Sequence, residues 1–281
     1  MSPAEHGILG FLLMSTVVAF FMIGVPGYWI IKRIWPESGW HLGGSVPTSC
    51  IRVYDLLVVG VLAVFYGLQW KLSQGQSFAL EEITIQTVVG SGIFYLLLAA
   101  IVPIILIRRT HLAEFFGLRW TEWRWGFLIV PAFVVSILMS AILLKEAGWH
   151  ERIQARFGSE LQGSVQLIQT SRDVPLLIAI TLSAVIIAPI AEEIIFRGYI
   201  YPVAKCYSER WFAAIFSAAL FGVVHMNLLG LPMLILIGLA LVILYEKTGS
   251  IWPCIFCHMA FNGLSIGIIF ISRFLNLPFP A

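Results

Sequence analysis

The stretch IIAPIAEEIIFRGYIY, residues 186–201, places Glu192, Glu193 and Arg197 inside an otherwise apolar run. A charged side chain within the hydrocarbon of a bilayer is costly, so it is usually paired or lies in a wet cavity. If this segment is helical, Glu193 and Arg197 are i,i+4 neighbours on one face, and Glu192 is turned about 100° away from Glu193. The sequence therefore predicts one paired and one free carboxylate, which suits an active site. A buried ion-pair network at a helix end is the alternative interpretation.

The composition indicates a membrane protein. Of the 281 residues, 59% are hydrophobic and only 11% are charged, whereas a soluble domain is usually about 25% charged. Since a helix needs roughly 20 apolar residues to cross a bilayer, we predict an all-α, polytopic bundle of about eight transmembrane helices. The candidate spans are residues 8–31, 54–71, 84–107, 126–144, 174–197, 212–229, 231–246 and 251–273. Gly198 is expected to end or bend the fifth of them.

The chain divides into two parts of one integral membrane domain. Residues 1–173 are expected to form four transmembrane helices with interfacial linkers, and residues 174–281 to form the catalytic helices. The linker 111–125 is rich in Trp and Arg, and the linker 151–168 carries an apolar stripe that includes Ile153, Leu161 and Val165. Both patterns are typical of segments that lie on the bilayer, which is therefore an expected partner. Ordinary connecting helices are an equal alternative.

The distribution of Lys and Arg predicts the orientation. With eight spans both termini lie on one side, and more basic residues fall on the loops of the other side. The positive-inside rule then makes that other side cytoplasmic, where Glu246 and Lys247 are expected to form a solvated pair. If Tyr199 and Trp252 mark the interface, Glu192 lies about 10 Å below it. We therefore expect a multi-pass protein of the bacterial inner membrane, with its active site toward the cytoplasm.

Two further segments carry polar residues inside predicted spans. The stretch LFGVVHMN places His225 one turn after Phe221, and CHMAFNG places His258 and Asn262 at i,i+4 on one face. A single histidine in a membrane helix is more often packed than catalytic. Polar faces on three different spans, however, are expected to converge in one polar chamber.

These segments resemble the CPBP family, which includes the type II CAAX prenyl endopeptidases. EEIIFR matches its EExxxR motif, FGVVH its FxxxH motif and HMAFN its HxxxN motif, and the resemblance covers about residues 174–265. It implies an intramembrane endopeptidase of the glutamic type. By this resemblance, Glu192 and His225 activate the attacking water, and His258 and Asn262 form the oxyanion hole.

The resemblance also implies the remaining roles and partners. Glu193, Arg197 and Phe221 are supporting residues. The substrate is expected to be a membrane-anchored protein or peptide, either prenylated, carrying a terminal sorting tail or a peptide precursor. We expect no cofactor and no nucleic acid partner. Zinc is a weaker alternative, because two histidines and a glutamate can bind it, although no H-E-x-x-H occurs here.

Other functions remain as alternatives. Intramembrane Glu and His also build proton-coupled carriers, but such carriers commonly show internal repeats and none is visible here. A non-catalytic membrane scaffold would tolerate loss of the motif residues, all of which are present. The stretch CIFCH, residues 254–258, matches a haem-attachment pattern. Because it falls inside a predicted transmembrane helix, we interpret its cysteines as incidental.

Overall fold

The computed structural model describes residues 3–34, 43–73, 83–157 and 163–275. Over these residues the regular structure is entirely helical, without a β-strand. The first half contains α1 (Pro3–Ile34), α2 (Val53–Ser73), α3 (Ile85–Leu106), α4 (Leu112–Phe115), the short 3₁₀-helix η3 (Trp123–Trp125), α5 (Gly126–Glu146), α6 (Trp149–Phe157) and α7 (Gly163–Thr170). The second half contains α8 (Val174–Leu182), η4 (Ser183–Ile187), α9 (Ala188–Ile195), η5 (Phe196–Ile200), α10 (Tyr201–Tyr207), α11 (Arg210–Val224), α12 (Leu231–Thr248) and α13 (Ile251–Phe274).

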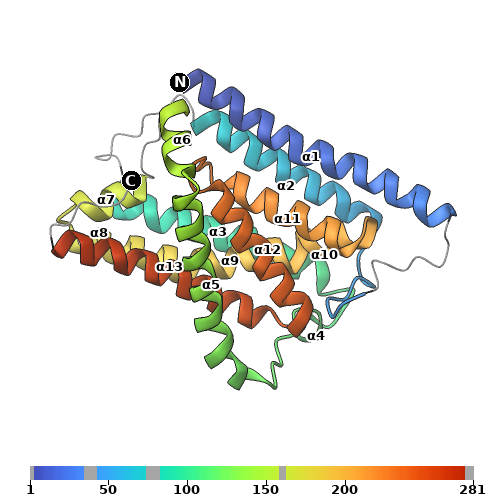
Figure 1. Ribbon diagram of the computed structural model, residues 1–281. Coiled ribbons are helices and arrows are strands. Elements are labelled where there is room, and N and C mark those ends of the chain that lie inside the picture. The colour runs from blue at the N-terminus through green and yellow to red at the C-terminus, as the bar shows by residue number, and fades with distance from the viewer. Residues whose placement is uncertain (1–2, 35–42, 74–82, 158–162, 276–281) are drawn as a thin grey trace.

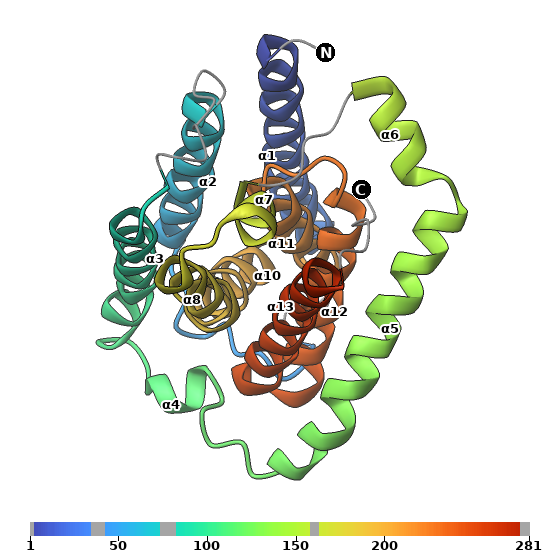
Figure 2. The same ribbon diagram turned by 90° about the vertical axis from the view of Figure 1, so that its left-hand side faces the viewer.

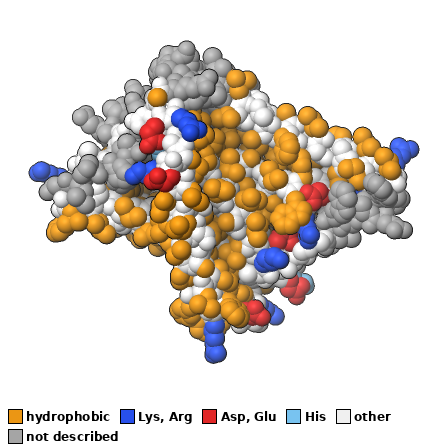
Figure 3. All heavy atoms as spheres, in the orientation of Figure 1, with side chains coloured by type: hydrophobic (Ala, Val, Ile, Leu, Met, Phe, Trp, Pro, Cys, Tyr) orange, Lys and Arg blue, Asp and Glu red, His pale blue; other side chains and the backbone are white. Residues whose placement is uncertain are grey.

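The protein is a polytopic helical membrane bundle, as predicted. Among the described residues, six helices are long and apolar enough to cross a bilayer: Leu12–Ile34, Ile85–Leu106, Trp123–Glu146, Val174–Tyr207, Leu231–Thr248 and Ile251–Phe274. The two other predicted spans correspond to shorter apolar helices, Val53–Gln69 and Arg210–Val224. The predicted count of eight is therefore not confirmed. Figure 3 shows one face of the bundle as a broad field of hydrophobic side chains, with charged side chains toward its edges.

The fifth predicted span is longer than the sequence suggested. It runs from Val174 to Tyr207 and contains two π-helical segments, η4 and η5. Gly198 does not end this helix but lies inside η5, fully within the bundle. A Cβ atom at this position would lie 2.5 Å from the ring of Phe116. Gly198 therefore allows a close approach between the helix and the segment that follows α4.

Capping side chains fix where the second-half helices begin. Asp173 precedes α8 and accepts a hydrogen bond from the backbone N–H of Leu176 at 3.1 Å. Glu209 caps α11 in the same way, and Ser250 caps α13. A side-chain oxygen at this position satisfies a backbone N–H that has no partner within the helix. Gly249 ends α12 in the left-handed conformation, with φ of 63°.

The helices define two ends of the bundle (Figures 1 and 2). We call the end where α1 begins and α13 finishes the terminal end; it also carries α7 and the start of α8. The other, the opposite end, carries α4 and the turns before α11 and α13. One hydrophobic core contains residues from both halves of the chain, including Tyr66, Phe133, Phe196 and Leu241. The two halves therefore pack as one body.

The two linkers differ in how they meet the bundle. Trp123 and Trp125 are exposed, as an interfacial segment requires. In the second linker, Ile153 is buried and Val165 lines a pocket, so the apolar stripe partly faces the protein. Leu161 lies outside the described residues.

Polar groups at the opposite end are paired inside the protein. Lys205, which the eight-span prediction assigns to a loop, is fully buried in α10, and its Nζ lies 2.5 Å from Glu246 Oε1 and 2.9 Å from the carbonyl oxygen of Val46. The hydroxyl of Tyr201 donates to the same Glu246 oxygen at 2.6 Å. The predicted solvated pair of Glu246 with Lys247 is therefore wrong. The apolar surroundings of α10 favour a paired lysine over a free one.

Candidate active site

Glu192 and His225 lie at the same level along the bundle axis, because the chain reverses direction at the turn at Ser208. These residues lie nearly the same number of positions before and after this turn, on helices that run in opposite directions. Because the rise per residue is constant in a helix, the two side chains come level. Tyr199 is fully buried and donates a hydrogen bond to Asp55, so its side chain does not face the lipid, and the depth of Glu192 below the membrane surface stays a prediction. Glu192 lies well inside the bundle, far from the end of α10.

Glu192 lies between two imidazole rings. Its Oε2 is 3.7 Å from His225 Nε2 and 3.8 Å from His258 Nε2, and its side chain is 15% exposed. Oε2 accepts no hydrogen bond from any described residue. These distances exceed a direct hydrogen bond, but a single oxygen atom about 2.8 Å from each group would bond to the carboxylate and to an imidazole together. The arrangement can therefore hold and polarise a water molecule.

Both histidines are oriented by their other ring nitrogen. His225 Nδ1 lies 2.6 Å from the carbonyl oxygen of Phe221, and His258 Nδ1 lies 2.8 Å from Glu193 Oε1. A carbonyl and a carboxylate oxygen are acceptors, so Nδ1 carries the proton in both rings. Each ring then turns Nε2 toward Glu192. A neutral imidazole in this tautomer presents a lone pair there, and a charged one presents an N–H.

Glu193 and Arg197 form the predicted i,i+4 ion pair. Arg197 Nη1 donates to Glu193 Oε1 at 2.9 Å, and both side chains are fully buried. Arg197 Nη2 also donates to the carbonyl oxygen of Gly238 at 3.1 Å. A Cβ atom on Gly238 would lie 2.9 Å from the backbone of Ala218, so α11 and α12 approach closely here. The sequence contained no direct signal for this backbone partner.

Phe221 packs against several of these groups at once. It is 1% exposed, and its ring centroid lies 4.6 Å from that of His225 and 5.7 Å from that of His258. The guanidinium carbon of Arg197 lies 4.5 Å from the same ring. Such a contact stabilises a buried cation. Phe221 thus fixes the spacing between the ion pair and the two imidazoles.

Asn262 reaches the site from α13. Its Nδ2 donates to the carbonyl oxygen of Ala184 in η4 at 2.8 Å. An asparagine amide carries two N–H groups, so one more can be offered to another acceptor. Segments of π-helix are frequent at functional sites. Here η4 brings a backbone oxygen to the side chain that the resemblance placed in the oxyanion hole.

The structure brings the four predicted catalytic residues to one pocket. Glu192, His225, His258 and Asn262 all line a cavity of about 350 Å³, together with Phe221. Apolar side chains from α7, α8, α12 and α13 complete its wall. The geometry thus places the residues together, and their catalytic roles stay predictions.

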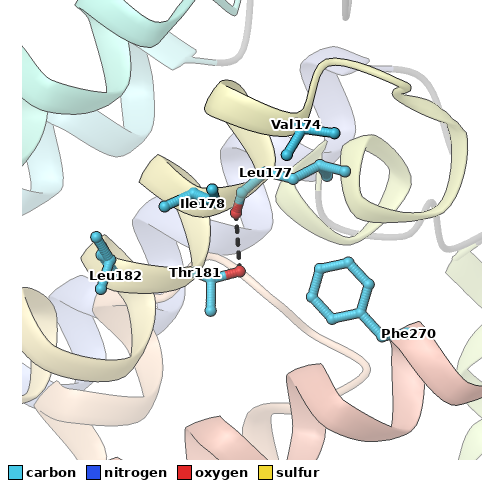
Figure 4. A pocket seen from close by; sticks show the side chains of 6 residues that line it. All are labelled: Val174, Leu177, Ile178, Thr181, Leu182 and Phe270. Carbon is cyan, nitrogen blue, oxygen red and sulfur yellow. Dashed lines mark hydrogen bonds between the residues drawn. The ribbon is translucent and has the colours of Figure 1, made fainter.

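A second hollow lies on the other face of α8 and differs in chemistry (Figure 4). It is lined by Val174, Leu177, Ile178, Thr181, Leu182 and Phe270. Its one hydroxyl, that of Thr181, donates to the carbonyl oxygen of Leu177 at 2.8 Å. No carboxylate, imidazole or thiol lines this groove. The groove therefore offers a surface to apolar chains but no reactive group.

The zinc alternative requires several metal-ligating side chains close together. The part of the chain that the structure describes contains no group of three or more His, Cys, Asp or Glu side chains arranged to hold a metal ion. Cys254 and Cys257 are free and fully buried in α13. Function without a cofactor stays a prediction, which metal-removal experiments can test.

Comparisons with known proteins agree with the motifs. Residues 174–264 match the family described as type II CAAX prenyl endopeptidase Rce1-like. The chain is 30% identical over 133 residues to "Putative membrane peptidase YdiL" of Bacillus subtilis (strain 168), covering 47% of this chain and 52% of that protein. The chain thus spans about half the length of this curated relative. No solved structure matches. The resemblance drawn from the three motifs is therefore confirmed where it was drawn: residues 174–264 are similar to the type II CAAX prenyl endopeptidases.

Proposed function

We propose that this protein is an intramembrane endopeptidase of the glutamic type. The observation that carries the proposal is the position of Glu192 Oε2 between the Nε2 atoms of His225 and His258, inside a pocket among membrane helices. The match of this segment to a prenyl endopeptidase family supports peptide-bond hydrolysis.

The first step is activation of water. Glu192 accepts a proton from a water molecule in the pocket, and the water oxygen attacks the carbonyl carbon of the peptide bond. His225 helps to hold this water by a hydrogen bond at Nε2. That nitrogen faces Glu192, because Nδ1 donates to the carbonyl oxygen of Phe221. The proton then passes to the leaving amine as the C–N bond breaks, which restores the Glu192 carboxylate.

The second requirement is stabilisation of the negative oxygen in the tetrahedral intermediate. Asn262 supplies its second amide N–H. His258 supplies an Nε2–H only as an imidazolium, because its Nδ1–H already donates to Glu193. Removing one donor to such an oxyanion typically slows catalysis by about 10²–10³-fold.

The substrate class follows from the location of the pocket. Glu192, His258 and Asn262 lie within helices long and apolar enough to cross a membrane, and His225 directly follows the shorter apolar helix α11. We therefore propose a membrane-anchored protein or peptide as the substrate. Prenylated tails, sorting tails and peptide precursors are all compatible with this. The bacterial inner membrane is the proposed location.

A comparison of protein termini tests this function. Membranes of the native host would carry either the wild type or Glu192→Gln at equal abundance, with Glu122→Gln, on an exposed linker, as the matched control. We expect a small set of new termini with the wild type and the control, and none with Glu192→Gln. Identical termini in all three strains would instead favour the carrier or scaffold function.

A metal-removal arm tests the glutamic type separately. Cleavage of the substrate found above should persist after exhaustive chelation. Loss of cleavage that only zinc restores would contradict the mechanism while retaining the peptidase.

A further inference from the structure

The active-site pocket extends in one direction from Glu192. On α13 its wall continues past Asn262 to Ser265 and Ile269, toward the end of the helix. On the fifth span it continues through Ala184 and Ile180, which precede Glu192. On α12 the wall uses residues near its start, such as Met233. Because of the helix directions, all these positions lie between Glu192 and the terminal end.

The other direction is closed by packed side chains. Glu193, Arg197 and Tyr199 follow Glu192 toward the opposite end, and each is 0% exposed. Cys254 and Cys257 precede His258 on α13 and are also 0% exposed. Nearer the opposite end, the fully buried Lys205 forms an ion pair with Glu246. A peptide could not reach Glu192 from the opposite end without unpacking these ion pairs.

The far part of the pocket is apolar and is covered by α7. Val165 and Ile168 of α7 line it together with Ile180, Ile266 and Ile269. Arg273 Nη1 donates to the carbonyl oxygen of Ile168 at 2.6 Å, which ties α7 to the end of α13. Figure 2 views the molecule from this side and shows α7 and α8 in front of α10. An extended peptide with apolar side chains fits such a lining.

We propose that the substrate reaches Glu192 from the terminal end, as an extended apolar peptide segment that passes between α7, α8 and α13. This inference rests on the proposed function for the identity of the occupant. It also has a consequence for topology. The sequence predicts that both termini lie outside and that the active site is open to the cytoplasm, and access from the terminal end allows only one of these two predictions to be correct. The compartment is then the one that contains the start of α1 and the end of α13.

Single cysteines test the direction of access. In a Cys206→Ser background we would introduce Ser265→Cys, a nearly isosteric change in the pocket wall. Thr170→Cys, exposed on α7, marks the terminal end, and Thr121→Cys, exposed beside η3, marks the opposite end. A small charged, membrane-impermeant thiol reagent would be applied to spheroplasts and to inside-out vesicles, with labelled sites mapped by mass spectrometry.

We expect the Ser265→Cys variant to react in the same preparation as the Thr170→Cys variant, and at background level in the preparation that labels Thr121→Cys. The native Cys254 and Cys257 should be unreactive in both. Met233→Cys, on a different wall of the pocket, repeats the test in case Ser265→Cys misfolds. Labelling of both pocket variants in the preparation that labels Thr121→Cys, or in neither preparation, would overturn the proposal.

The same labelling in a Glu192→Gln background separates the two proposals. Access does not require catalysis, so the pattern should be unchanged there. If the termini comparison fails while the labelling succeeds, the peptidase function is wrong and the access route stands. If the labelling fails while Glu192→Gln still abolishes the new termini, only the route is wrong.

Discussion

Two acidic side chains inside the bundle differ in how their carboxylates are hydrogen-bonded. Asp55 is 0% exposed and accepts hydrogen bonds from Arg109 Nη1 at 2.9 and 3.0 Å, from the Tyr199 hydroxyl at 2.7 Å and from the backbone N–H of Arg52 at 2.6 Å. Glu192 is 15% exposed, and its Oε2 accepts none from the described residues. A carboxylate with every lone pair engaged stabilises the fold, whereas one with a free oxygen beside two imidazoles can exchange protons.

The two carboxylates are associated with different parts of one continuous span, Val174–Tyr207. The part from Arg197 to Lys205 is fully buried and is tied to α2, α12 and the Val46 loop by paired polar groups. The part from Ile180 to Glu192 lines the pocket. One end of the helix is thereby held rigidly, so that the other can present a reactive group at a defined place. Catalytic groups need such a fixed support.

The largest expected effect is on cleavage. Glu192→Gln keeps the shape of the side chain but removes the proton acceptor, so cleavage should fall by about 10²-fold or more. The unfolding temperature in detergent should stay at the wild-type value, because Oε2 has no hydrogen bond to lose among the described residues. A large drop in that temperature would show that Glu192 is structural, like Asp55, and would remove the contrast.

The second prediction concerns the buried ion pair. Glu193→Gln leaves Arg197 charged and without its carboxylate, which should lower the free energy of unfolding by about 3–5 kcal/mol. The double variant Glu193→Gln/Arg197→Met removes the unpaired charge and should recover part of this loss. Denaturant titration in detergent measures both. A double variant less stable than the single one would mean that Arg197 is held mainly by Gly238 and Phe221.

The third prediction concerns Asp55. Asp55→Asn weakens charge-assisted hydrogen bonds, each worth about 1.5–3 kcal/mol, so the free energy of unfolding should fall by about 2–3 kcal/mol. Cleavage per folded molecule should change little, because Asp55 contacts this helix at Tyr199, about 10 Å along it from Glu192. A loss of cleavage at full stability would show instead that Asp55 acts on the active site.

The smallest expected effect comes from a glycine. Gly198→Ala places a methyl group against the ring of Phe116, at 2.5 Å before any relaxation, and overpacking of this kind costs about 1–3 kcal/mol. Gly27→Ala is the matched control, because among the described residues no atom beyond its own stretch of helix lies within 4 Å of its added Cβ. Thermal unfolding should separate the two variants. Equal stability would mean that the segment after α4 yields, and that this end of the helix is less rigid than we infer.

The amino-acid sequence alone determined the local and compositional properties. Low charge and long apolar runs predicted a helical membrane bundle. The i,i+4 spacing predicted the pair of Glu193 with Arg197, which the structure contains, because a helix fixes the distance between such residues. Three motifs in order predicted a family resemblance that the comparisons confirm.

The tertiary structure decided everything that depends on contacts between distant segments. It assigned Glu246 to Lys205, placed Tyr199 in the core against Asp55, and gave Asn262 and Arg197 the carbonyl oxygens of Ala184 and Gly238. Backbone carbonyls are present at every residue, so the sequence carries no signal for which one is used. The direction of the pocket likewise depends on which helix faces pack together, and no local spacing rule specifies that.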